Sequence, residues 1–199
     1  TVEIIRQAWP AIQVLELPEP SKVQALRQAM ALVEPGTLII LDADIAVPIS
    51  ALRVLIAPLS NGPGGHDGAI AAVGYFEPDT SESDLWVRLF YQVWRHHPYF
   101  DGGKFGGCYA LATRAHQVIA TLPDVINDDE YVARSMSKLG SVVTTDCRFA
   151  TKAPRHLGEL IRVRSRVQRG NRQLAAMAVA GAIPPVSSQT DAAGAIKLK

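Results

Sequence analysis

The sequence predicts an α/β fold with a largely parallel sheet in a single domain. The chain has 199 residues, of which 48% are hydrophobic, and this is enough for one substantial core. Residues 38–41 form a short apolar run without helical periodicity, which is typical of a strand buried on both faces of a parallel sheet. The segments around this run alternate strand, helix and strand with short links, which is a βαβ pattern.

The first βαβ unit comprises an alternating strand at 12–17, an amphipathic helix at 22–33 and the apolar strand at 38–41. Ser21 is suited to cap the helix. The apolar residues of the helix recur every three or four positions, so one face of it is expected to pack on the sheet. A helix at 2–9 precedes this unit and is ended by a proline.

The remaining elements alternate between apolar strands and amphipathic helices. Hydrophobic periodicity and the Gly and Pro residues between the periodic segments set their boundaries. The expected helices are 49–59, 83–96, 114–122 and 127–139, and the expected strands are 69–76, 108–112 and 141–145. We expect one domain over 1–175, followed by a disordered tail over 176–199 that is rich in Ala, Gly, Pro and Ser.

Composition narrows the classes of function. The net charge of +1 favours neither nucleic acid nor membrane as a partner. The sequence contains no signal peptide and no apolar run of membrane length, which predicts a cytoplasmic protein. Cys108 and Cys147 lack metal-site spacing and are expected to be small buried hydrophobic residues in a reducing compartment, not a disulfide. Thr1 stands where a Met would begin a chain, so we expect a fragment.

Two carboxylates, Asp42 and Asp44, follow the apolar strand directly. In open α/β sheets, ligands bind at the carboxyl ends of the strands. One acid can hold Mg²⁺ or Mn²⁺, while the other binds the ion through water or contacts a ligand hydroxyl. An EF-hand is excluded because its third acid, its Gly and its final Glu are missing. The alternative is a solvated acidic turn.

A second acidic cluster comprises Asn127, Asp128, Asp129 and Glu130. Asn127 and Glu130 have the spacing of a capping box, and acids in a first helical turn are stabilised by the helix dipole. Three consecutive acids exceed what capping requires, however. A carboxylate fixed on a helix that is anchored in the core is a candidate general base.

Two further segments carry weaker signals. The glycine-rich segment 102–107 matches neither a Walker loop nor a dinucleotide fingerprint, and predicts a close backbone approach to a ligand or another loop. Residues 148–172 contain eight Lys and Arg against one acid. This stretch is either a solvated helix face or a contact for a diphosphate or an anionic lipid. No aromatic residues interleave the arginines, which argues against a nucleic-acid partner.

Five segments, in order and in spacing, resemble motifs of the family 2 glycosyltransferases of the GT-A fold. Residues 38–48 resemble the family's apolar strand with its Asp-x-Asp motif. Residues 21–26 resemble a Gly-Lys-x-x-Ala-Leu helix start with Ser in place of Gly, and 106–110 resemble the glycine-led strand beside the acceptor site. Residues 128–140 resemble the Glu-Asp motif and its helix, with Asp128 for Glu. Residues 164–170 resemble the Gln-x-x-Arg-Trp region, although Val163 and Val167 replace the Gln and the Trp.

The resemblance implies a three-layer α/β/α fold with a mixed, mostly parallel sheet and an incomplete Rossmann-like half, because the family's first βαβ segment would precede Thr1. It implies an inverting transfer of a sugar from a nucleotide-diphosphate sugar to a hydroxyl of a glycan or lipid-linked acceptor, in glycan, glycolipid or cell-envelope biosynthesis. Peripheral contact with the membrane would suit such an acceptor. A sugar-nucleotide nucleotidyltransferase and a non-catalytic binding module are the alternatives.

The resemblance also implies roles for individual residues. Asp129 would be the general base, and Asp44, assisted by Asp42, would hold Mn²⁺ or Mg²⁺. The remaining implied residues are Asp42, Lys22, Arg166 and Arg169 at the nucleotide-sugar diphosphate, and Gly106, Gly107 and Asp128 on the acceptor side.

Overall fold

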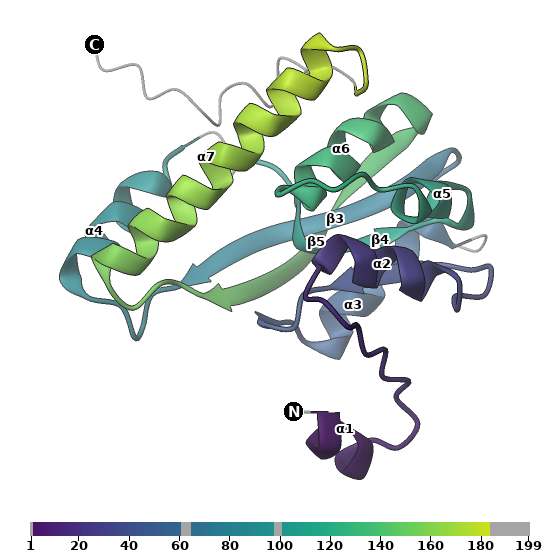
Figure 1. The fold of residues 1–199 in the computed structure, drawn as a ribbon, viewed down its shortest axis with the longest axis horizontal. Helices are drawn as coiled ribbons and strands as arrows, with labels where there is room; N and C mark the ends of the chain where they lie inside the picture. Colours follow the sequence, from purple (N-terminus) through teal and green to yellow (C-terminus); the bar gives the residue numbers. More distant parts are fainter. Residues whose placement is uncertain (1, 61–64, 98–100, 184–199) are drawn as a thin grey trace.

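The computed structural model describes residues 2–60, 65–97 and 101–183 (Figure 1). Within these residues the centre of the fold is a five-stranded sheet with the order β1-β4-β3-β5-β2. The strands are β1 (Leu38–Leu41), β2 (Ile45–Ala46), β3 (Ala69–Asp79), β4 (Lys104–Leu111) and β5 (Ser141–Lys152). The long strands β3 and β5 form the middle of the sheet, and the two short strands lie at its edges.

The sheet is mixed, as expected, but the expected parallel majority is wrong. Strands β3 and β5 pair in parallel, whereas β1 with β4, β3 with β4 and β2 with β5 pair antiparallel. The expectation was based on a βαβ unit that began with a strand at 12–17, and the structure has no strand there. Without that strand, β1 is an edge strand, and Leu41 is 45% exposed instead of buried on both faces.

The helices begin and end close to the expected positions. They are α1 (Val2–Ala8), α2 (Lys22–Met30), α3 (Ile49–Ile56), α4 (Leu85–Trp94), α5 (His116–Ala120), α6 (Asp128–Leu139) and α7 (Leu157–Val179). Short 3-10 turns at Ala57–Leu59 and Thr113–Ala115 adjoin α3 and α5. Helix α7 continues into the segment that was expected to be the tail, and residues 184–199 lie outside the described residues.

Alternation along β3 divides the core into two layers. Ala71 and Val73 face α2, α5 and α6, where they pack with residues such as Met136. Ala72 faces the opposite way and packs with Leu55 of α3. Successive side chains of a strand point to opposite faces, so the sheet is covered on both sides. This arrangement is the predicted three-layer α/β/α class, which is confirmed.

The two cysteines lie together on the α3 side of the sheet. Cys108 and Cys147 are free thiols and are fully buried, which confirms that they are small buried residues of the core. Burial, together with the neighbouring Cys147, raises the pKa of Cys108 to about 12. Burial likewise raises the pKa of Cys147.

A third cluster joins α4 to the first half of α7, at the end of the sheet that lies beyond the other helices (Figure 1). Val87 and Tyr91 of α4 pack against Leu160 of α7. The Arg164 guanidinium lies 5.1 Å from the ring centroid of Trp94, which is a cation–π contact. The basic stretch therefore forms the second part of β5 and most of α7, and one of its arginines is used in packing.

Candidate functional site

A cleft of about 1850 Å³ lies at the carboxyl end of β1. Its walls come from the start of α2, the turn after β1, the glycine pair of β4, the start of α6, the end of β5 and the first half of α7. All the predicted site residues except Arg169 line this cleft. Arg169 is exposed and lies nearly one helical turn beyond Arg166, so the structure does not bring it into the cleft.

The turn after β1 is fixed by a close approach to Gly107. The backbone N–H of Asp42 donates to the Gly107 carbonyl oxygen at 2.8 Å. Gly107 has φ +83°, and a Cβ there would lie 3.2 Å from Oδ2 of Asp42 and 3.1 Å from Cδ1 of Ile45. Only glycine suits this conformation and spacing. The close backbone approach expected in the glycine-rich segment is thus confirmed at Gly107.

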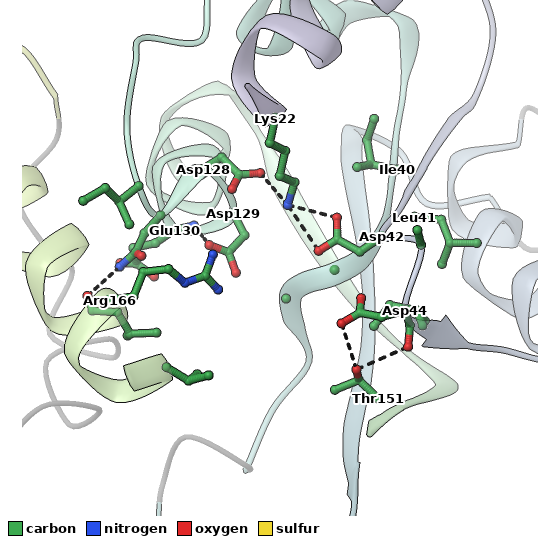
Figure 2. A pocket seen from close by; sticks show the side chains of 18 of the residues that line it. Lys22, Ile40, Leu41, Asp42, Asp44, Asp128, Asp129, Glu130, Thr151 and Arg166 are labelled. Atoms are coloured by element: carbon green, nitrogen blue, oxygen red, sulfur yellow. Dashed lines mark hydrogen bonds and ion pairs between the residues drawn. The ribbon is translucent and has the colours of Figure 1, made fainter. Parts of the chain in front are cut away.

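Lys22 joins the two acidic segments of the sequence. Ser21 caps α2 by accepting from the N–H of Gln24 at 3.2 Å, which places Lys22 at the first position of the helix. Its Nζ lies 2.9 Å from Oδ1 of Asp42 and 2.9 Å from Oδ2 of Asp128, as Figure 2 shows. Burial lowers the pKa of Lys22, but the two carboxylates, Asp128 foremost, outweigh it and raise that pKa above its ordinary value.

Asp44 lies beside Thr151 of β5 (Figure 2). The hydroxyl of Thr151 lies 3.3 Å from Oδ2 and 3.3 Å from the carbonyl oxygen of Asp44, and donates to this residue. The two acids are separated by one residue and have different partners: Asp42 pairs with a cation, and Asp44 accepts from a neutral hydroxyl.

The start of α6 presents Asp128 and Asp129 to the cleft. Oδ1 of Asp129 accepts from the N–H of Glu130 at 2.8 Å. Burial and the neighbouring charge of Asp128 raise the pKa of Asp129 above its ordinary value. A carboxylate with a raised pKa is better matched to proton abstraction near neutral pH than an ordinary aspartate.

The expected capping box is wrong. The side chain of Asn127 makes no capping bond to α6. It donates instead to α7, to the Val167 carbonyl oxygen at 3.0 Å and to Oδ1 of Asn171 at 2.8 Å. Glu130 pairs with Arg134 at 2.8 Å and does not reach back to residue 127.

Helix α7 holds the start of α6 through neutral groups. A Cβ at Gly170 would lie 2.3 Å from Cγ of Asn127, so the glycine allows the two segments to touch. The Gln173 side chain accepts from the N–H of Ile126 at 2.9 Å and donates to the Asp124 carbonyl oxygen at 2.8 Å. This anchoring fixes the direction in which the acids of α6 point.

Sequence reasoning missed several residues at this site. Thr151 contacts Asp44, from which it is separated by 107 positions in the sequence. No local sequence pattern indicates such a pair. The interhelical role of Asn127 was hidden by its capping-box spacing. Arg162 and Arg164 line the cleft beside Arg166, and the basic stretch was their signal. Figure 2 shows Arg166 on the α7 side, opposite Lys22.

The acids suit a divalent cation that is shared with a ligand. Among the described residues, no three His, Cys, Asp or Glu side chains gather closely enough to hold a metal by themselves. Mg²⁺ and Mn²⁺ usually take one or two protein carboxylates and complete their coordination with water and substrate phosphates. Asp44, which forms no ion pair within the described residues, and Asp42 supply such a donor set.

Two solved glycosyltransferases have a similar fold. A mannosyltransferase from Pyrobaculum calidifontis, solved with GDP-Man and Mn²⁺, matches with a TM-score of 0.62 and 19% identity over 89% of this chain and 50% of that chain. Glucosyl-3-phosphoglycerate synthase from Mycobacterium tuberculosis, solved with Mn²⁺, UDP and glucosyl-3-phosphoglycerate, matches with a TM-score of 0.50 and 15% identity over 86% of this chain and 58% of that chain.

This chain therefore spans about half the length of the solved proteins that it matches. Comparison of the sequence with models of protein families and with curated proteins finds no match. No helix in the described ranges is long and apolar enough to cross a bilayer. Fold and cleft together lead to one conclusion: the chain has the GT-A-like fold of these glycosyltransferases.

Proposed function

We propose that this chain is a metal-dependent, inverting glycosyltransferase domain of family 2 type. It would transfer a sugar from a nucleotide-diphosphate sugar to a hydroxyl of a glycan or lipid-linked acceptor. The observation that carries the proposal is the convergence of Asp42 and Asp44 with Asp128 and Asp129 on one cleft of a GT-A-like fold. The acids after β1 would provide the metal ligand, and the acids at the start of α6 would provide the base.

Asp44, assisted by Asp42, would hold Mn²⁺ or Mg²⁺. When bound, the ion stabilises the negative charge that develops on the leaving diphosphate. Lys22 and Arg166 lie on opposite walls of the cleft and offer further positive charge to the phosphates. Gly106 and Gly107 line the cleft beside the Asp42 turn and, with Asp128, would form its acceptor side.

Asp129 would act as the general base. Its carboxylate takes the proton of the acceptor hydroxyl while the acceptor oxygen bonds to the anomeric carbon. The bond from that carbon to the diphosphate oxygen breaks on the opposite face, so the configuration is inverted. The raised pKa of Asp129 increases the driving force for this transfer.

The test is a screen of nucleotide sugars with Mn²⁺, using the longest natural chain that contains these residues. We expect sugar transfer by the wild type, loss of metal dependence and of most activity in Asp44→Ala, and loss of transfer with retained donor binding in Asp129→Asn. Full activity of Asp129→Asn would refute the assigned base. Release of pyrophosphate from a nucleoside triphosphate would indicate a nucleotidyltransferase instead, and binding without turnover would indicate a binding module.

We also propose that the domain contacts the cytoplasmic face of the membrane peripherally. One face of α4 exposes the apolar side chains of Leu85, Trp86 and Val93. Helix α7, which packs on α4, carries exposed arginines such as Arg162. Exposed apolar groups beside cations suit an anionic lipid surface. Binding to vesicles that contain anionic lipid, but not to neutral ones, and its loss in Trp86→Ser, would support this contact.

A further inference from the structure

Tyr109 carries a buried hydroxyl that has no hydrogen-bond partner within the described residues. Tyr109 lies in the middle of β4, between Ile40 of β1 and Val73 of β3, and is 1% exposed. The ring packs against Phe105 with a centroid distance of 5.1 Å. A buried hydroxyl without a partner destabilises the folded state. A phenylalanine would avoid that cost in this apolar layer, so the hydroxyl requires another explanation.

The charged groups around this hydroxyl are the acids of the cleft. Burial raises the pKa of Tyr109, and the charges of Asp128, Asp129 and Asp42 raise it further. Asp42 follows β1, which pairs with β4 at Tyr109. The other two acids begin α6, and Val132 of that helix belongs to the same core cluster as Tyr109. Lys22 of α2 is the cation among them. The hydroxyl therefore remains protonated and is available as a hydrogen-bond donor on the side of the core from which α6 begins.

Asp128 depends on a cation that the proposed reaction would draw away. Its side chain is only 9% exposed, and its ion pair is with Lys22 at 2.9 Å. If the proposed function is right, a diphosphate in the cleft attracts the ammonium of Lys22. Asp128 then loses this ion pair while it remains buried, and a buried charge without a partner is strongly unfavourable.

We propose that Tyr109 is a positioning residue whose hydroxyl serves as the reserve donor to Asp128. While Lys22 holds Asp128, the hydroxyl has no partner in the part of the chain that the structure describes. When Lys22 turns to a ligand phosphate, the hydroxyl donates to the Asp128 carboxylate and keeps it from moving toward Asp129. The start of α6 thus keeps its geometry during the exchange, and no bond is made or broken other than hydrogen bonds.

A double-mutant cycle tests the exchange without any substrate. The variants are Tyr109→Phe, Lys22→Met and the double variant, melted at pH 8 beside the wild type. In the wild-type background, Tyr109→Phe should leave Tm unchanged or raise it, because it removes an unsatisfied hydroxyl. In the Lys22→Met background, the same change should lower Tm by about 4 °C, because Asp128 then needs the donor. Equal shifts in both backgrounds would overturn the proposal.

Matched controls keep the cycle interpretable. Tyr91→Phe changes a buried tyrosine of the α4–α7 cluster and should shift Tm equally in both backgrounds. Lys22→Gln provides a second neutral variant if Lys22→Met does not melt cooperatively. In a separate arm, UDP and GDP are titrated with Mn²⁺, and Tyr109→Phe should weaken binding about tenfold. Absence of binding by the wild type would refute the proposed function, whereas the cycle alone decides the role of Tyr109.

Discussion

The two walls of the cleft are held by different forces. On the β1 side, Lys22 joins Asp42 to Asp128 through charge, and its own side chain is 46% exposed. On the α7 side, Asn127 and Gln173 tie the start of α6 to its neighbour through neutral hydrogen bonds around Gly170. A charged contact responds to salt, pH and anionic ligands, whereas a neutral packed contact does not. The first wall is therefore the one that a ligand can rearrange.

The largest expected effect is on the catalytic rate, through Asp129 at the start of α6, which both walls hold in place. Asp129→Asn removes the proton acceptor but keeps the shape of the side chain, and should lower kcat by about 10²–10⁴-fold. The acid limb of the wild-type pH profile should lie above that of an ordinary aspartate, because the pKa of Asp129 is raised and the base works only when deprotonated. Steady-state kinetics from pH 4 to 8 measure both. An unchanged kcat in the variant would leave Asp129 without a catalytic role.

The neutral wall should be broken most strongly by adding a methyl group. A Cβ at Gly170 would lie 2.3 Å from Cγ of Asn127, so Gly170→Ala should destabilise the fold by about 1–3 kcal/mol through overpacking. Gly158→Ala, on the same helix, meets no atom within 4 Å and should stabilise by about 0.4–1 kcal/mol. Urea denaturation of the two variants provides the measurement. Equal effects of the two substitutions would show that the contact at Gly170 has room for a methyl group.

The contributions of the two walls to stability should differ in their dependence on salt. Asn127→Ala removes the donor to Val167 and Asn171 and should cost about 1–2 kcal/mol at any ionic strength. Lys22→Met should cost about 1 kcal/mol at low salt and less at 1 M, because partly exposed ion pairs are screened. Denaturation midpoints at 0.05 M and 1 M NaCl give both numbers. A salt-dependent effect in Asn127→Ala would contradict the distinction between the walls.

The smallest expected effect is a dependence of stability on pH. A carboxylate whose pKa is raised by folding favours the folded state while it is protonated, and this contribution is lost as the pH rises through the folded value. Relative to Asp129→Asn, the wild type should therefore lose stability as the pH rises above about 4, the ordinary value for an aspartate. Thermal melts of both proteins from pH 4 to 8 test this, and parallel curves would exclude it.

Local signals in the sequence predicted the helices and the first residues of β3 and β5, although β5 continues to Lys152 and the expected strand ended at residue 145. The Ser21 cap and apolar periodicity placed α2, and apolar periodicity alone placed α6. The apolar run at 38–41 placed β1 with two acids at its end. What failed depends on contacts between distant segments. An apolar run does not determine whether its strand pairs parallel or antiparallel. The alternating segment 12–17 pairs with no strand in the structure, so it is not a strand.

The candidate site shows the same limit. The residue types of Asp42, Asp44 and Asp129, and their positions at the ends of predicted elements, were enough to assign them to one candidate site. The partner of each acid was not predictable: Thr151 reaches Asp44 from the end of β5, and Lys22 joins two acids from different elements. Asn127 had two possible uses, and packing against Gly170 decided between them.

The buried cysteine pair has a practical consequence for experiments on this protein. Maleimides and oxidants react with thiolates at accessible positions, and Cys108 and Cys147 are fully buried with raised pKa values. A single cysteine introduced on an exposed position, for example at Val93 of α4, should therefore take a fluorophore or spin label selectively. Motion of α4 and α7 around the cleft can then be followed in the otherwise wild-type chain, without first removing its native thiols.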